Sequence, residues 1–422
     1  PVIVAVMGLV ALFGRGGVLN AALTALGLPA LSIYGLQGVV LAHVFLNLPL
    51  AVRMLLQGWQ AIPAERFRLA ASLSFAPAEM ARHLELPMLR AVLPGAAATV
   101  FALCLTSFAV ALILGGGPAA TTLELAIYQA LRFEFDLGHA AGLALLQALI
   151  GGAAALAAWS AATTAGFGAG LDRVLPLAAP LGWRRVADLT VLLAAAGFLL
   201  LPMAAVLAQG LPGLMALPRA VWPALGRSVA VALISTLVTI SAALTLALAV
   251  ARRKAGWLDL AATLPLATSG LALGTGLFLL LQPLWPPARL ALPVTVAVNA
   301  LLALPFAYRI LLPQAQALQQ DYGRLADSLG LTGAARLRLL HLPRLRRPLG
   351  FGAGIVAALS MGDLGVIALF ASDGQATLPL VVQRLLGAYR VEAAAAASLL
   401  LVGASLALFW AFDQWGRHAD AG

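Results

Sequence analysis

Residues able to carry chemistry are few in this 422-residue chain, and they stand far apart in the sequence. The five histidines are scattered, and no His/Cys group has the spacing of metal ligands. The only lysine, Lys254, lies in Ala-Arg-Arg-Lys-Ala-Gly, which does not fit the Gly-x-x-x-x-Gly-Lys-Ser/Thr loop that binds nucleotide phosphates. Cys104 is the single cysteine, so a disulfide within the chain is excluded. We therefore expect no catalysis, no metal site and no cofactor in the chain itself.

Asp363 is the one acid about midway along a long apolar run, where it is flanked by Gly362 and Gly365. A carboxyl group in such a place is costly in lipid, so a functional role is a reasonable hypothesis. In one interpretation Asp363 faces a cavity and draws a cation inward. In the other it is a structural acid bonded to a neighbouring helix. By contrast, we expect Glu124, Glu134 and Asp136 to lie on a solvated surface.

Two basic loops, 59–92 and 314–347, repeat each other at a constant offset of 256 residues. Between positions 68 and 90, 12 of 23 residues are identical to those 256 positions later, without a gap. The same register pairs Ser107 with Asp363, so both are candidates for a translocation path. Each loop is typical of a short helix, a turn and a second helix, with Gly330 placed where a helix ends in a left-handed turn.

The elements that hold these loops are apolar and helical. The chain is 62% hydrophobic and only 10% charged, against about a quarter charged in soluble domains, so part of its surroundings must be lipid. Because a membrane-crossing helix needs about 20 apolar residues, the sequence predicts an all-α integral membrane protein. The ten spans we expect are 1–13, 35–55, 93–114, 139–162, 187–209, 226–250, 259–282, 290–313, 348–371 and 393–415.

The net charge of +10 does not indicate nucleic acid, because the basic residues are spread over short loops. Of the 26 basic residues, 19 fall on the side that carries both repeated loops and 7 on the other side. This bias places both loops in the cytoplasm. Six expected spans separate the loops, so the repeats are parallel rather than inverted. We expect a first unit at 1–165 that is incomplete at its N-terminus, a cytoplasmic linker at 166–186 and a second unit at 187–422.

Both loops resemble the "EAA" loop of binding-protein-dependent ABC importer permeases. Ala326, Gly330, Leu342 and Pro343 occupy matching places, although arginine replaces the family's glutamate. The resemblance implies two tandem permease units, coupling loops that dock two cytoplasmic ATPase subunits, ATP bound by those subunits alone, and a periplasmic solute-binding protein. It assigns the ATPase contact to the following residues: Arg68, Leu69, Ala70, Leu73, Ser74, Leu86, Pro87, Arg324, Leu325, Ala326, Leu329, Gly330, Leu342 and Pro343.

A closer resemblance runs over essentially the whole chain, including Thr121-Thr122-Leu123-Glu124-Leu125-Ala126 and Asp363-Leu364-Gly365-Val366. These stretches are similar to permeases of thiamine and thiamine pyrophosphate importers. This family implies a cationic substrate for the Asp363 hypothesis and a bacterial inner-membrane location. The alternatives that remain are a ferric-iron importer permease and a secondary transporter without ATPase partners.

Overall fold

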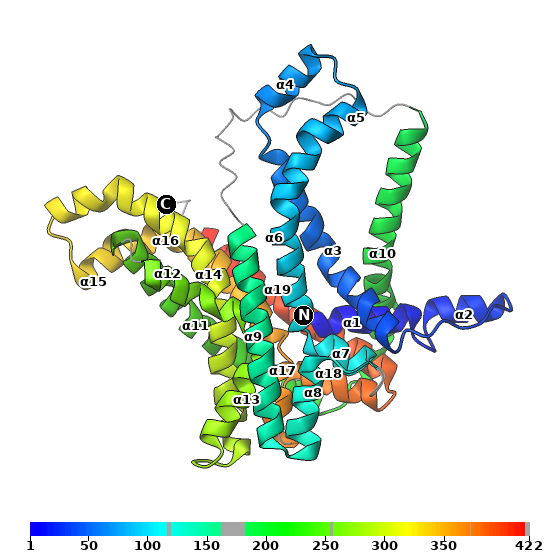
Figure 1. Cartoon of the computed structure of the whole chain (residues 1–422). Helices are drawn as coiled ribbons and strands as arrows, with labels where there is room; N and C mark the ends of the chain where they lie inside the picture. The colour runs from blue at the N-terminus through cyan, green and yellow to red at the C-terminus, as the bar shows by residue number, and fades with distance from the viewer. Residues whose placement is uncertain (116–119, 162–181, 254–255, 372, 418–422) are drawn as a thin grey trace.

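The computed structural model describes residues 1–115, 120–161, 182–253, 256–371 and 373–417. Within these ranges every regular element is a helix and no strand is present (Figure 1). The prediction of an all-α chain is therefore confirmed. The expected linker at 166–186 lies mostly outside the described residues. The helices of the first part are α1 (Val2–Phe13), α2 (Val18–Ala25), α3 (Leu36–Gln60), α4 (Ala64–Ser72), α5 (Pro77–Met80), α6 (Leu86–Leu105), α7 (Phe108–Leu114), α8 (Leu123–Gln129) and α9 (Leu137–Ala161).

The second part begins with α10 at Trp183, so the predicted start of the second unit at 187 falls in the first turns of this helix. Its helices are α10 (Trp183–Gly213), α11 (Val221–Arg253), α12 (Gly256–Thr263), α13 (Gly270–Leu281), α14 (Pro287–Ser328), α15 (Gly333–Arg336), α16 (Leu342–Met361), α17 (Gly365–Phe370), α18 (Leu378–Gly387) and α19 (Val391–Arg417). Short 3₁₀ turns lie at Leu214–Ala216, Leu264–Ala267 and Asp373–Gln375, and π-helical turns lie at Ala81–Glu85, Ala130–Glu134 and Leu337–His341.

In the described part of the chain, nine helical segments are long and apolar enough to cross a membrane. Ten were expected, and the prediction of one continuous span at 259–282 is wrong. This segment divides into α12 and α13, with a 3₁₀ turn containing Pro265 between them. Thr268 is extended, and the Ser269 side chain accepts a hydrogen bond from the backbone N–H of Ala272. An N-cap of this kind starts a new helix and so interrupts the old one.

Helix boundaries repeat at the same offset as the sequence. The π-helical turns at Ala81–Glu85 and Leu337–His341 begin 256 residues apart, and so do α6 and α16, which follow them directly. Both α6 and α16 are 20 residues long. The repeat in sequence therefore corresponds to a repeat in local structure.

The most extensive helix–helix contacts lie in the second part, where α14 packs on α11 and α16, and α16 packs on α19. One large apolar cluster also joins the two parts: Ile127 of α8 and Phe108 of α7 share it with Leu271 of α13 and Ile367 of α17. In Figure 1 the α4–α5 turn and the α14–α15 turn project from this body at different places. The body of the bundle thus positions two protruding turns. It also contains the two helix breaks at Ser107 and Asp363.

Candidate functional site

The two protruding turns are built alike. Helix α4 ends with Phe75 N–H donating to Ala70 C=O and Ser74 N–H donating to Ala71 C=O. Helix α14 ends with the same pair of bonds, from Leu331 to Ala326 and from Gly330 to Asp327. This pattern is the Schellman motif, which needs a left-handed residue after the helix.

The left-handed positions are Ser74, with φ +53°, and Gly330, with φ +63°. The expectation of a left-handed turn at Gly330 is therefore confirmed. Ser74 adopts the same conformation although it carries a Cβ atom, which L-residues tolerate poorly there. The first turn is thus formed against the preference of Ser74, whereas Gly330 adopts this conformation without strain.

Exposure also repeats between the two turns. Ala70 and Ala326 are buried, whereas Leu69, Leu73, Leu325 and Leu329 expose 54–64% of their surface. Two leucines at the end of each helix are therefore presented outward, on a short segment held from behind by a buried alanine. Apolar residues exposed in a cluster mark an interaction surface more often than chance. Arg68, Arg324, Leu86, Pro87, Leu342 and Pro343 are exposed as well.

The two path candidates both lie where a long helix is broken. The expected span 93–114 is divided, because α6 ends at Leu105 and α7 begins at Phe108, which leaves Ser107 in the break. The expected span 348–371 is divided at the matching place, between α16 and α17, where Asp363 stands. The structure thus gives Ser107 and Asp363 equivalent positions.

Part of the Asp363 carboxyl group has a structural role. It accepts hydrogen bonds from the backbone N–H groups of Gly365 and Val366 at the start of α17. The other oxygen, Oδ2, is buried without a hydrogen-bond partner among the described residues. A buried acceptor without a partner is unusual and needs an explanation.

The expectation that Glu124 lies on a solvated surface is wrong, since only 1% of its surface is exposed. Its Oε1 atom accepts a hydrogen bond of 2.7 Å from Gln147 Nε2, and the Ser269 hydroxyl also hydrogen-bonds to it. Gln147 Nε2 contacts Leu105 C=O as well, at 3.2 Å. Glu124 therefore links α8 to α9 and to the start of α13, within electrostatic range of Asp363. Glu134 and Asp136, in contrast, are exposed as expected.

No sequence signal in α8 alone identified this burial. The segment Leu-Glu-Leu-Ala-Ile-Tyr-Gln is seven residues long, too short for a period to distinguish an inner from an outer face. Thr122, whose side chain accepts from Leu125 N–H, indicates only that a helix starts at that point.

Broken helices inside a multi-helix membrane bundle are a feature of many transport proteins. No family model matches the chain. Among curated proteins, thiamine transport system permease proteins named ThiP are similar to it over nearly its whole length. The protein of Brucella abortus (strain 2308) is 37% identical over 435 residues, which covers 98% of this chain and 78% of the relative.

The Salmonella typhimurium protein is 38% identical over 442 residues, covering 99% of this chain and 80% of the relative. The Haemophilus influenzae protein is 35% identical over 442 residues, covering 100% and 80%. The chain belongs to the family of thiamine transport system permease proteins. A permease moves its solute without changing a covalent bond, so this subunit is not an enzyme.

Proposed function

We propose that this chain is the translocation subunit of an ABC importer in the bacterial inner membrane, and that it moves thiamine and its phosphates inward. The proposed mechanism rests on the two repeated turns that expose leucines, and the proposed substrate rests on the similarity to the ThiP proteins. Energy comes from separate ATPase subunits, and a periplasmic solute-binding protein delivers the solute. The chain needs no cofactor of its own.

The proposed organisation is two parallel permease units, 1–165 and 187–422, joined by a linker at 166–186. It is supported by the constant 256-residue offset of sequence, π-helical turns and exposed leucines. Both turns would then face the cytoplasm, where each contacts one of two ATPase subunits through Leu69 and Leu73 or Leu325 and Leu329. Arg68 and Arg324 replace the family's acidic residue, so these leucines and the turn, rather than a glutamate, provide the contact.

Ser107 and Asp363 are proposed to lie beside the solute path. Half-helices meeting in a membrane expose backbone groups and side chains to a central site, which is where many transporters bind their solute. The unpartnered Oδ2 atom of Asp363 offers a negative group to a thiazolium cation. Replacement of Asp363 by Asn is expected to lower thiamine transport at normal expression. Unchanged transport would contradict this role.

The substrate is tested with the full-length protein in liposomes, together with its ATPase and binding protein. The rate of ATP hydrolysis is recorded with thiamine, thiamine pyrophosphate or ferric ion. Stimulation by the thiamine compounds alone is expected. Stimulation by ferric ion alone would support an ABC importer but contradict thiamine as its substrate. Transport that persists after ATP depletion, but stops when a proton gradient is collapsed, would contradict the assignment as an ABC importer.

A further inference from the structure

The two protruding turns, which are the proposed coupling turns, differ in how they join the membrane helices. Helix α14 runs without interruption over 42 residues from Pro287 to Ser328, so the second coupling segment, 324–328, is the end of a long helix. In the first unit α3 ends at Gln60, Ala61 and Ile62 follow, and a separate helix α4 starts at Ala64. The second turn is thus continuous with the bundle, and the first is separated from it by a break.

Three substitutions at the 256-residue offset accompany the difference. Pro63, the N-cap of α4 in the first unit, corresponds to Gln319, which lies inside α14 in the second. Ala71 corresponds to Asp327, and Met80 corresponds to Arg336. All three residues of the second unit are polar, and Arg336 bonds to both of the others.

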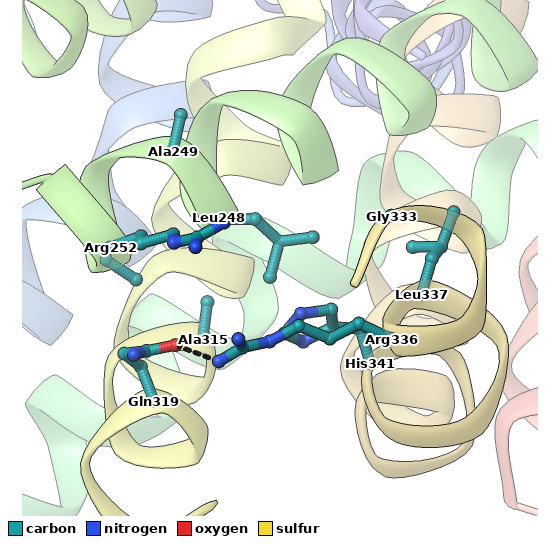
Figure 2. Close-up of a pocket in the computed structure, with 10 residues that line it drawn as sticks. Leu248, Ala249, Arg252, Ala315, Gln319, Gly333, Arg336, Leu337 and His341 are labelled. Carbon is teal, nitrogen blue, oxygen red and sulfur yellow. Dashed lines mark hydrogen bonds between the residues drawn. The ribbon is translucent and has the colours of Figure 1, made fainter. Parts of the chain in front are cut away.

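Arg336 joins these polar residues. Its Nη1 atom donates to Asp327 Oδ1 at 2.6 Å, and its Nη2 atom donates to Gln319 Oε1 at 3.0 Å. The arginine is only 6% exposed. Figure 2 shows it extending from the end of α15 toward Gln319 on α14. Because a planar guanidinium group bonds in fixed directions, the two contacts set the orientation of the turn as well as its distance.

The surroundings of Arg336 favour these bonds. A cavity of about 280 Å³ beside it is lined by Arg252, His341 and Gln319 among others, and no acidic residue lines it. Asp327, which pairs with Arg336 Nη1, is therefore the acid that compensates the charge of Arg336. Removal of the arginine would leave the turn without its polar link to α14, whereas the nearby Arg338 is exposed.

Apolar packing covers the buried side of the first turn. Ala70 of α4 lies in a small cluster with Ile62, Leu84 and Met88, and Met80 packs against its edge. Apolar contacts are not directional, so they fix the orientation of this turn less strictly than the bonds of Arg336 fix that of the second turn. The second turn is thus joined to α14 by directional polar bonds, whereas the first follows a break in the helix and packs through apolar side chains.

We propose that Arg336 is a positioning residue that makes the second coupling turn a rigid extension of α14, so that ATPase movement enters the bundle mainly through the second unit. The inference rests on the proposed docking of ATPase subunits to both turns. The first turn follows its ATPase subunit by pivoting and transmits less of its displacement.

The test uses the full-length importer in liposomes with its ATPase and binding protein. The measured quantity is the number of thiamine molecules imported per ATP hydrolysed. Arg336→Met, which installs the residue of the first unit, is expected to lower this ratio by about tenfold, the scale of a lost charged hydrogen bond. Gln319→Pro should act in the same direction, Arg336→Lys should restore part of the ratio, and the control Arg338→Met should leave it unchanged.

Co-purification of the ATPase subunit distinguishes the positioning role of Arg336 from the proposed docking of the ATPase subunits. Normal binding with a normal ratio in Arg336→Met would overturn the positioning role alone. Normal binding after both Leu325 and Leu329 are changed to Asp would overturn docking itself. As a second readout, spin labels at Ser328 and Thr245 report the position of the turn. Their distance distribution should broaden in Arg336→Met and stay narrow in Arg338→Met; equal distributions would also refute the positioning role.

Discussion

The close contact between α16 and α19 leads to a sharp prediction at Gly350. A Cβ atom on this residue would lie 2.5 Å from Phe412 C=O and 2.7 Å from the Cα atom of Gly416. Non-bonded carbon atoms prefer separations of about 3.5–4.0 Å, so Gly350→Ala forces the helices apart by about 1 Å. One glycine on each helix at this point lets the two backbones touch, as small residues do in membrane helix pairs.

The expected loss is about 1–3 kcal/mol, the usual cost of an extra methyl group forced into a packed interior. Backbone atoms form the obstacle, and they cannot rotate away as a side chain can. Gly352 on the same helix provides a matched control, because a Cβ atom there would lie 3.6 Å from the nearest atom, the end of the Ile240 side chain. Gly352→Ala should therefore be close to neutral.

The assay is thermal unfolding of the purified protein in detergent, with the two variants prepared in parallel. Gly350→Ala should melt several degrees below wild type, and Gly352→Ala within about one degree of it. Because α16 leads from the second coupling turn to the Asp363 break, transport should also fall in Gly350→Ala. Equal melting temperatures for the two variants would refute the close-contact argument.

Further predictions concern the buried acid and the turns. Glu124→Leu should lower the free energy of unfolding by about 1–3 kcal/mol, because Gln147 loses its carboxylate partner; a double variant that also carries Gln147→Leu should recover much of that loss in the same melting assay, and an additive loss would argue against the pair. Ser74→Gly should stabilise the first turn and Gly330→Val should destabilise the second, by about 1–2 kcal/mol each, because only glycine adopts a positive φ without strain. Protection of the turn amides from hydrogen exchange measures both, and an unchanged rate at either turn would contradict the strain argument.

The all-helical membrane architecture could be predicted because it depends on composition and run length, which lipid thickness constrains strongly. The repeat was visible for a similar reason: its loops are polar, so identical residues stand out against an Ala/Leu-rich background. Gly330 could be assigned to a left-handed turn because glycine is the usual residue there. Such inferences rest on local rules.

Other features depended on partners distant in sequence. Nothing near Glu124 indicates that Gln147 and Ser269 surround it, so an acid in a short helix looked solvent-exposed. The break at Ser269 was hidden because the flanking segments are both apolar. Arg336 bonds to Gln319, which lies 17 residues earlier on α14, and no local pattern indicates this contact. Only the folded arrangement reveals these contacts.

The paired breaks at Thr106–Ser107 and Gly362–Leu364 restrict how the bundle can move. Where a helix stops, amide and carbonyl groups lose their partners within that helix, and hydrocarbon chains supply no replacements. Each break must therefore stay shielded from the acyl chains in every conformation, by protein or by water. Whatever rearrangement carries a solute across, the two breaks are confined to the sheltered axis of the bundle, and the sliding of helices along the lipid boundary must occur elsewhere.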